Sequence, residues 1–462
     1  MDNTLLQERN GWYKYALPVL MLFSFFITLL PFLIHSATPL GYDTGFYRRY
    51  LINPVVSFPN TAVPGLDHTI ILPRVLLDAV RTLGFSPDIT LYGTYIALML
   101  LLVWSFYRFV RLHTNEASAL LASLLLITAP VFYTAYWFMF FKNILALSFF
   151  FWALSSFKKE RWWLAFLFSI AIPLSHQGTT IIYLAILGAY IFIKACKKEK
   201  ILHELLIFAG TLSIYLYLHP SLVSKIIAPP VGVFLTRIDF LILISPILIP
   251  IIFNFKKVWV VIHSQTILIT TLLVLIAFPL LSLPYYPRTF LLLGILLCIP
   301  AAIGIQFMIK DRESRFHKTT IAIVALVLVA HTSLLTWKIV TLRPLVSEAE
   351  QRMFISIKQN VPKGTAILTP SHMTPWIQGW SQARVYSPGV LKDAHTPSEW
   401  SLYWSHQDSS YDVMFLASFP SPLYIIVDER DSHSFLPEPH CITPLSEMIY
   451  RYDCANEVPN YH

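Results

Sequence analysis

The stretch Tyr15–Ile34 reads YALPVLMLFSFFITLLPFLI and contains no charged side chain. The hydrocarbon core of a bilayer is about 30 Å thick, and a helix of about 20 apolar residues crosses it. This stretch therefore predicts a transmembrane helix. It is too long for the apolar part of a signal peptide and lacks a small-residue cleavage site, so we expect it to stay in place as an anchor.

The whole chain has the composition of a membrane protein. Of its 462 residues, 56% are hydrophobic and 13% are charged, whereas roughly a quarter of the residues in soluble domains are charged. The fold class predicted from the sequence is an α-helical polytopic membrane protein with about eleven transmembrane helices. We place them near residues 15–35, 89–110, 115–131, 139–157, 162–175, 177–194, 201–219, 237–255, 258–282, 289–309 and 319–340.

The basic residues of the short loops predict the orientation, because cytoplasmic loops are enriched in Lys and Arg. With the N-terminus in the cytoplasm, the N-terminal tail and five loops carry seventeen Lys and Arg, and the four short outer connections carry three. Fusing 162–175 with 177–194 would put the basic clusters at Lys158 and Lys194 on opposite sides, so we keep two helices. The sequence predicts a multi-pass protein of the cell (plasma) membrane with an extracytoplasmic C-terminus.

Two longer segments then lie on the outer side. Residues 1–343 form the transmembrane domain, and its first outer loop, 36–88, contains at 66–83 an amphipathic pattern typical of a helix lying on the membrane surface. Residues 344–462 predict a small exported soluble α/β domain. Its signals are β-like runs at 365–368 and 424–427 and a helix at 348–359.

The basic excess does not indicate nucleic-acid binding. Residues 1–343 carry 27 Lys and Arg against 13 Asp and Glu, whereas residues 344–462 carry 7 against 13. The positive charge therefore belongs to the short loops of the membrane domain, where it sets topology, and it does not form a groove for a phosphate backbone. We expect no nucleic acid among the partners.

The four cysteines agree with the predicted orientation. Cys196 falls in a cytoplasmic loop and Cys298 in a helix, whereas Cys441 and Cys454 both lie in the exported domain. A disulfide can persist in that compartment. The pair Cys441 and Cys454 could form one there, and two free thiols are the alternative.

Asp43 is the first candidate for chemistry, in the segment Gly41-Tyr-Asp-Thr-Gly-Phe-Tyr47 just beyond the first helix. A carboxylate at the membrane edge suits a general base or a ligand for a divalent ion. The alternative is an Asp that stabilises a turn beside Gly41 through local hydrogen bonds.

His176 and Arg288 are candidates for binding a phosphate. His176 occupies the tight turn Ser175-His-Gln-Gly-Thr179 between two short helices, where it could donate to a phosphate oxygen or simply cap a helix. Arg288 opens the helix at 289–309 and combines a fork of donors with the positive end of the helix dipole. Its alternative is an interfacial anchor with its head group in water.

Lys142 lies just inside the outer end of the helix at 139–157, between aromatic residues. An ammonium there is costly unless it is paired or reaches the interface. A phosphate or the Asp43 carboxylate could pair with it, and reaching the interface is the alternative. The charge count places Asp43, Lys142, His176 and Arg288 on one face, as transfer of a sugar from a polyprenyl phosphate requires.

These segments resemble the GT-C class of integral membrane glycosyltransferases, which use lipid-phosphate sugars. Members of that class carry an acidic residue soon after the first helix, and Asp43 resembles it. They also have an outer turn that contains a His, which Leu174-Ser-His-Gln-Gly178 resembles, and an Arg that opens a late helix, which Arg288 resembles. An outer C-terminal domain with segments like Thr374-Pro-Trp-Ile-Gln-Gly-Trp380 and Leu423-Tyr-Ile-Ile-Val-Asp428 also resembles members of the class.

The resemblance implies roles for several residues. Asp43 would be the catalytic base of an inverting glycosyltransferase, and Arg288, His176 and Lys142 would bind the donor phosphate. Many members carry two adjacent acidic residues, whereas Asp43 has no acidic neighbour before Asp67. The missing acidic neighbour favours Asp43 as a metal-independent base, and a divalent metal (Mg²⁺ or Mn²⁺) stays open as a cofactor. Aromatic rings that could contact the sugar or acceptor are Tyr42, Tyr47, Tyr285, Tyr286 and Trp376.

The expected partners are the lipid bilayer, a polyprenyl-phosphate-linked sugar and an acceptor that the sequence does not identify. The main alternative is a transporter or flippase of lipid-linked saccharides. Transporters place charged residues near the bilayer midplane and often contain repeats, whereas the polar residues here gather at one rim. A polymerase or ligase of lipid-linked glycans and a non-catalytic scaffold are further alternatives.

Overall fold

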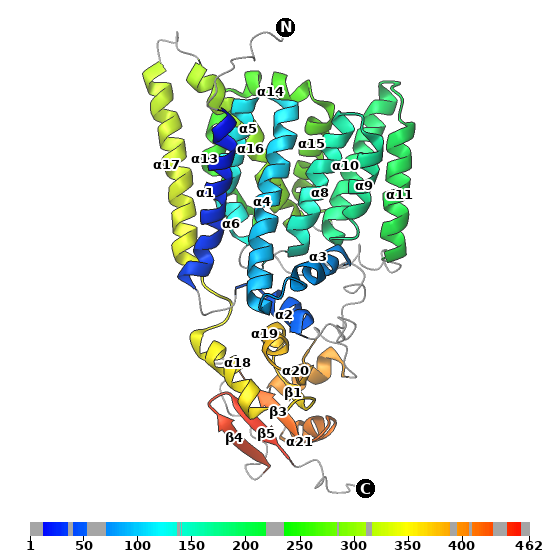
Figure 1. Ribbon diagram of the computed structural model, residues 1–462, viewed down its shortest axis with the longest axis vertical. Helices are drawn as coiled ribbons and strands as arrows, with labels where there is room; N and C mark the ends of the chain where they lie inside the picture. Colours follow the sequence, from blue (N-terminus) through cyan, green and yellow to red (C-terminus); the bar gives the residue numbers. More distant parts are fainter. Residues whose placement is uncertain are drawn as a thin grey trace.

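The computed structural model describes residues 13–35, 40–52, 71–135, 139, 141–218, 235–283, 286–310, 317–388, 395–405, 409–427 and 441–453. Within these ranges the chain forms a helical bundle and, below it in Figure 1, a smaller C-terminal α/β unit. We call the end of the bundle beside this unit the domain-facing end and the opposite end the far end.

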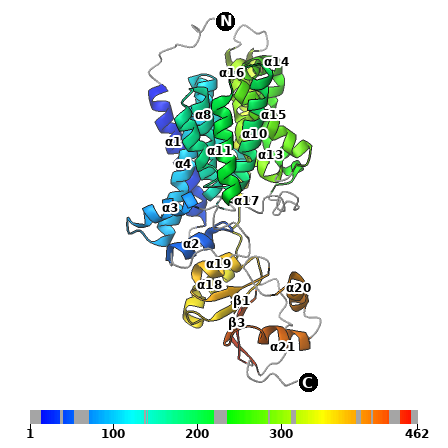
Figure 2. The ribbon, with the colours of Figure 1, turned by 90° about the vertical axis from the view of Figure 1, so that its right-hand side faces the viewer.

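The bundle is built from helices that follow one another along residues 13–341. In chain order they are α1 Tyr13–Ile34, α4 Pro87–His113, α5 Glu116–Ile127, α6 Pro130–Tyr133, α8 Phe141–Lys158, α9 Trp162–Ala171, α10 Gln177–Cys196, α11 Leu202–Leu218, α13 Arg237–Phe253, α14 Phe255–His263, α15 Thr266–Leu280, α16 Tyr286–Lys310 and α17 His317–Thr341. Two further helices, α2 Thr44–Ile52 and α3 Ile71–Arg81, lie at the domain-facing end (Figures 1 and 2). The second of them falls inside the stretch predicted to be amphipathic.

Several of these helices are long and apolar enough to cross a membrane. Among the described residues five qualify singly, within α1, α4, α10, α16 and α17, and the bent pair α13 and α14 would make a sixth. In α16, 83% of the most apolar stretch is buried, against 22% in α1 and in α17, so α16 lies in the middle of the bundle and the other two at its periphery. The chain is a multi-pass membrane protein, and the count of eleven spans stays a prediction.

Two predicted helices differ from the structure. The prediction of one helix over 258–282 is wrong, because the apolar run is divided between α14 and α15, and α14 bends by 91° from α13. Val258 and Ile262 are buried on one side of α14, and Lys256 and Lys257 are exposed, so this short helix lies across the far end (Figure 1). The segment 115–131 is also divided, because Pro130 cannot donate a helical hydrogen bond and starts α6.

The C-terminal unit is a mixed sheet with helices on both faces. Its elements are α18 Glu348–Asn360, β1 Ala366–Leu368, α19 Thr374–Trp380, β2 Arg384–Tyr386, α20 Pro397–Ser405, α21 Ser409–Ala417, β3 Leu423–Ile426, β4 Ile442–Ser446 and β5 Ile449–Tyr452. The strand order is β2-β1-β3-β5-β4, with β1 parallel to β2 and to β3 and the other pairs antiparallel. Parallel strands need crossover helices, and Figure 2 shows α18 and α19 on one side of the sheet and α20 and α21 on the other.

The cysteines have different states. Cys441, in the C-terminal unit, is disulfide-bonded. Its predicted partner, Cys454, lies outside the described residues. Cys196 and Cys298 are free thiols, the first exposed and the second buried in α16.

Candidate functional site

Asp43 and Lys142 form an ion pair at the domain-facing end. Asp43 directly precedes α2, and Lys142 is the second residue of α8. The Asp43 Oδ2 and Lys142 Nζ atoms are 3.8 Å apart, and the side chains are 30% and 18% exposed. A partly buried ammonium is costly without a counter-charge. The carboxylate supplies that charge, which was one of the two arrangements expected for Lys142.

His176 caps α10 and at the same time faces the site. Its Nδ1 accepts a hydrogen bond from the Thr179 backbone N–H at 3.1 Å, so Nε2 carries the proton of the neutral ring. Burial, and then the charges of Arg288 and Lys142, lower the pKa of His176 well below its ordinary value. The imidazole is therefore neutral at pH 7, and its Nε2–H is a hydrogen-bond donor.

Arg288 meets His176 from the first turn of α16. Its Nη1 lies 3.4 Å from His176 Nε2. Its side chain passes over Gly178, where a methyl group would come within 3.5 Å of the Arg288 Cδ atom. The guanidinium carries only donors, and the facing Nε2 is also a donor. An oxygen anion bound beside both groups would accept from each of them.

Two polar side chains, Thr179 and Asn143, lie between the two pairs. The Thr179 hydroxyl lies 2.8 Å from His176 Nδ1 and 3.3 Å from Asn143 Oδ1, and it can donate its one proton to either acceptor. Asn143 follows Lys142 in α8, and Lys142 lies within electrostatic range of both Asp43 and Arg288. The structure thus brings the four residues singled out in the sequence into one polar cluster.

An apolar wall borders the half of this cluster that contains His176 and Arg288. One pocket is lined by polar groups of His176, Arg288, Asn143 and Thr179 and by hydrocarbon side chains. The hydrocarbon lining consists of Leu147, Ile182, Leu291 and Leu292. A pocket with donors on one side and hydrocarbon on the other matches a phosphate attached to a lipid tail.

Of the aromatic residues proposed as sugar contacts, Trp376 and Tyr47 are buried. Trp376 is 2% exposed, and its ring packs edge-on against Tyr42 with centroids 5.6 Å apart. Tyr47 is 3% exposed and packs on Phe141 at 5.3 Å. Both rings serve packing in this structure, so the sugar-contact prediction rests on more exposed rings.

Tyr42 and Tyr286 are half-buried and lie at the domain-facing end. Burial, and then the Asp43 carboxylate, raise the pKa of Tyr42 to about 12, so its hydroxyl stays protonated and donates to the Ser371 carbonyl oxygen at 3.0 Å. Tyr286 begins α16, and the Arg237 guanidinium carbon lies 5.0 Å from its ring centroid. Tyr285 lies outside the described residues.

The sequence prediction did not include Asn143 and Thr179, although both belong to the cluster. Each stands within three residues of a predicted site residue, Lys142 or His176. A polar side chain beside a buried charge in an apolar helix was the available signal. The sequence does not show which loops meet in space, so a polar residue that joins a site looks the same as one that only caps its own helix.

The side chains around Asp43 show which ligands a divalent metal ion could have there. Within the described ranges, no group of three or more His, Cys, Asp or Glu side chains could hold a metal ion. Asp43 is instead next to the Lys142 ammonium. Asp43 is therefore the one predicted residue that could contribute a carboxylate ligand to Mg²⁺ or Mn²⁺, and the metal stays a prediction.

Sequence comparison finds no relatives: no protein-family model matches the chain, and no curated protein matches it by sequence. Solved structures do match it. The oligosaccharyltransferase AglB from Archaeoglobus fulgidus, in complex with an inhibitory peptide and a dolichol-phosphate, superposes with a TM-score of 0.68 at 11% identity, over 90% of this chain and 69% of that one.

Two further structures extend this likeness. ArnT from Cupriavidus metallidurans, bound to undecaprenyl phosphate, matches with a TM-score of 0.59 at 11% identity, over 96% of this chain and 98% of that one. The mycobacterial arabinofuranosyltransferase AftD matches with a TM-score of 0.58 at 13% identity, over 90% of this chain and 35% of that one.

The fold shared with these three proteins is that of the GT-C class of membrane glycosyltransferases, and this chain has it. The fold resemblance inferred from the sequence is thereby confirmed. At 11–13% identity the likeness defines the architecture. The activity has to be argued from the site.

Proposed function

We propose that the chain is an inverting glycosyltransferase that moves a sugar from a polyprenyl-phosphate donor to an acceptor on the outer face of the membrane. The observation that carries this proposal is the pocket in which donors of His176 and Arg288 stand beside a leucine-rich wall. Its two halves have the chemistry that would recognise a lipid phosphate, the donors for the anion and the hydrocarbon for the tail. The Asp43 carboxylate stands on the other side of the same cluster.

The proposed step is a single displacement. The acceptor nucleophile attacks the anomeric carbon and forms the new glycosidic bond while the bond from that carbon to the phosphate oxygen breaks. Asp43 takes the proton of the nucleophile. The polyprenyl phosphate leaves with the electron pair, and the donors of Arg288 and His176 stabilise its charge. Attack opposite the leaving group inverts the anomeric carbon.

Lys142 has two roles in this proposal. Its ammonium is the counter-charge of the Asp43 carboxylate and is near enough to Arg288 to add to the positive potential around the leaving phosphate. A divalent metal bound there would place a positive charge beside the carboxylate, and the Lys142 ammonium already places one there. We therefore propose a reaction in which Lys142 supplies this charge.

Known ligands of the similar structures support the donor class. ArnT was solved with undecaprenyl phosphate and AglB with a dolichol-phosphate. A transporter of lipid-linked saccharides remains the second candidate function. It would bind the same lipid phosphate but would have no use for a carboxylate base beside it.

The proposed orientation puts the far end in the cytoplasm and the C-terminal unit, residues 344–462, outside. Contacts at the far end support it, because loops predicted to be cytoplasmic meet there. Lys158 Nζ donates to Gln265 Oε1 at 3.0 Å, and Lys197 Nζ donates to Thr266 Oγ1 at 3.4 Å. Gln265 follows α14, which lies across the far end (Figure 1). Such a basic end is typical of the cytoplasmic side.

The function is tested with the full-length protein in liposomes. The vesicles are supplied with polyprenyl phosphates that carry radiolabelled sugars and with a lipid and glycan extract as acceptor. We expect label to move to the acceptor and unglycosylated polyprenyl phosphate to accumulate in equal amount. Label that crosses the bilayer while still attached to the polyprenyl phosphate would contradict the transferase and identify a transporter.

Cys196 provides a natural probe of orientation. It is an exposed free thiol in the segment predicted to be cytoplasmic, where the structure makes it the last residue of α10, and Cys298 is buried. A membrane-impermeant maleimide should label Cys196 in inside-out vesicles and leave it unlabelled in intact cells. Cys196→Ser is the matched control and should abolish labelling in both. Labelling in intact cells would invert the topology and remove the outer-face proposal.

A further inference from the structure

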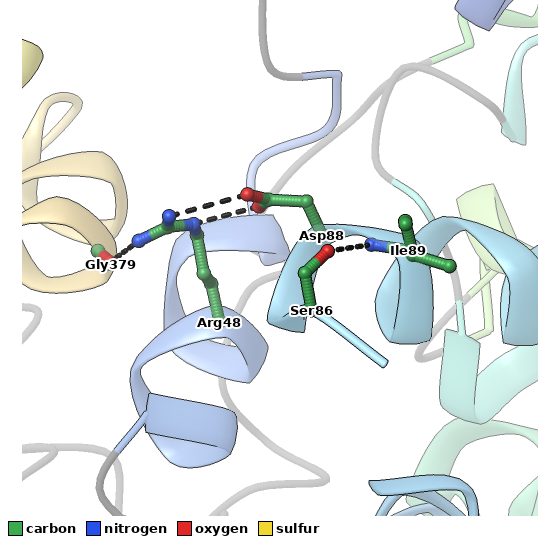
Figure 3. A network of polar contacts seen from close by, with 5 residues as sticks. All are labelled: Arg48, Ser86, Asp88, Ile89 and Gly379. Atoms are coloured by element: carbon green, nitrogen blue, oxygen red, sulfur yellow. Dashed lines mark hydrogen bonds and ion pairs between the residues drawn. The ribbon is translucent and has the colours of Figure 1, made fainter. Parts of the chain in front are cut away.

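Helix α2, which begins one residue after Asp43, is held by groups from both parts of the molecule. The Arg48 guanidinium donates from Nε and Nη2 to the two carboxylate oxygens of Asp88, at 2.8 and 3.3 Å, and from Nη1 to the Gly379 carbonyl oxygen at 2.6 Å (Figure 3). Asp88 lies in the first turn of α4 and Gly379 in α19. One side chain thus joins a helix of the bundle, α2 and a helix of the C-terminal unit.

The Arg48 side chain is buried against α19. The residue is 9% exposed, and its guanidinium carbon lies 4.4 Å from the centroid of the Trp380 ring. The next residue, Arg49, donates from Nη1 to the Ser381 carbonyl oxygen at 2.5 Å. A planar guanidinium that pairs with a carboxylate through two parallel bonds has little freedom to move.

Two glycines let α2 and α19 touch through their backbones. A methyl group on Gly45 would lie 1.7 Å from the Pro375 carbonyl oxygen, and one on Gly379 would lie 2.6 Å from the Gly45 Cα atom. Neither helix can approach in this way with a larger residue at the crossing. The C-terminal unit is therefore docked directly on the turn of helix that follows Asp43.

The other side of α2 leads to both halves of the candidate site. The Tyr47 ring packs on Phe141, the residue before Lys142. The Tyr50 hydroxyl bonds to Asp78 of α3. Helix α3 also contacts the segment that carries His176, because the Leu72 backbone N–H donates to the Leu174 carbonyl oxygen at 3.1 Å.

We propose that Arg48 is a positioning residue, which sets the place of Asp43 by locking α2 between α4 and the C-terminal unit. The inference rests on the proposed function, in which Asp43 is the base. It assigns the C-terminal unit a task in the reaction, namely to hold α2 against the bundle. Arg48 acts through α2, and no residue of α2 lines the proposed phosphate pocket, which is made of residues from α8, α10, α16 and the turn before α10.

Gly45→Ala tests this lock from the α19 side, in the full-length protein in liposomes. The added methyl group must push α2 away from α19, and Asp43 moves with it. We expect kcat to fall by about 100-fold, because a misplacement of about 1 Å has an effect of that size. Donor KM and binding of polyprenyl phosphate should stay within about twofold of wild type. The matched control is Gly93→Ala, which adds the same methyl to α4 where nothing lies within 4 Å.

Arg48→Lys tests the lock from the α4 side. Lys keeps the charge but cannot form the two parallel bonds to Asp88, so we expect kcat to fall by about tenfold. Combined with Asp88→Asn, the loss should be smaller than the product of the two single losses, because both changes break one link. Arg352→Gln, a substitution in an exposed ion pair on α18, is the control and should leave kcat unchanged.

The outcomes separate this inference from the proposed function. A fall of kcat with donor binding preserved supports the positioning role. Unchanged kcat, or a parallel loss of kcat, donor binding and thermal stability, overturns it. If Gly45→Ala fails to accumulate in the membrane, Arg48→Lys alone decides. Absence of transfer by the wild type would refute the function itself, whereas an active wild type with unaffected variants refutes only the lock.

Discussion

Asp43→Asn is expected to lower kcat by about a thousandfold, because a general base contributes 10²–10⁴-fold. Asn keeps the shape of the side chain but cannot accept the proton of the acceptor. The Lys142 ammonium, 3.8 Å away, would still face a polar oxygen, so membrane insertion and donor binding should persist. The measurement is transfer of radiolabelled sugar in liposomes at saturating donor, with binding of polyprenyl phosphate followed in parallel.

Asp239→Asn is the matched control for this prediction. Asp239 is a carboxylate in the first turn of α13, where it forms a capping box with Thr236. It takes no part in the cluster around Lys142, and an amide in its place removes a charge without disturbing the proposed site. Turnover should therefore stay within about twofold of wild type. Full turnover by Asp43→Asn would exclude Asp43 as the base, whatever the control does.

The four residues of the candidate site could be found in the sequence because an apolar chain leaves few places for charge. Lys142 follows Phe140 and Phe141 at the start of an apolar helix, and Arg288 opens a long apolar helix, so each needs a partner. Counting basic residues in the loops put both on the side of Asp43 and His176. The contacts of Asp43 with Lys142 and of His176 with Arg288 agree with that placement.

The contacts that hold Asp43 in place could not be predicted in the same way. Arg48 and Gly379 are separated by 331 positions, and no periodic pattern relates them. Gly45 and Gly379 gave a weak signal, because glycine inside a helix often marks a close approach. Trp376 was open to a binding role from sequence, and only the packing of its ring on Tyr42 shows its place in the core.

The break between α14 and α15 eluded the sequence for a different reason. Hydropathy measures how well a run tolerates lipid, and the run through α14 and α15 contains few charges to mark a turn. The apolar end of α14, which buries Val258 and Ile262 against the bundle, continues into the apolar sequence of α15 without a charged residue between them. The amino-acid composition of an apolar helix shows that the helix is buried in the bundle or in lipid, but it does not show whether the helix crosses the membrane or lies across one end.

Arg288→Ala is expected to weaken binding of a polyprenyl phosphate by about 10- to 100-fold, because hydrogen bonds to a charged group contribute roughly 1.5–3 kcal/mol. The fold should not suffer. A cation in the first turn of α16 opposes the helix dipole, so its removal does not destabilise that helix. The affinity of Arg288→Lys should lie between those of the wild type and Arg288→Ala, since Lys keeps the charge but not the paired guanidinium donors. The measurement is displacement of labelled donor by polyprenyl phosphate at two salt concentrations.

Arg237→Ala distinguishes a direct contact from a general positive potential. Arg237 lies at the start of α13, donates to the Ser282 hydroxyl at 2.6 Å and stacks on Tyr286, which is two residues from Arg288. It does not line the pocket of His176, so its loss should change affinity by about twofold or less. Equal losses in both variants would indicate long-range attraction that salt screens. Unchanged affinity in Arg288→Ala would place the phosphate elsewhere, and the leucine-lined pocket would lose its proposed ligand.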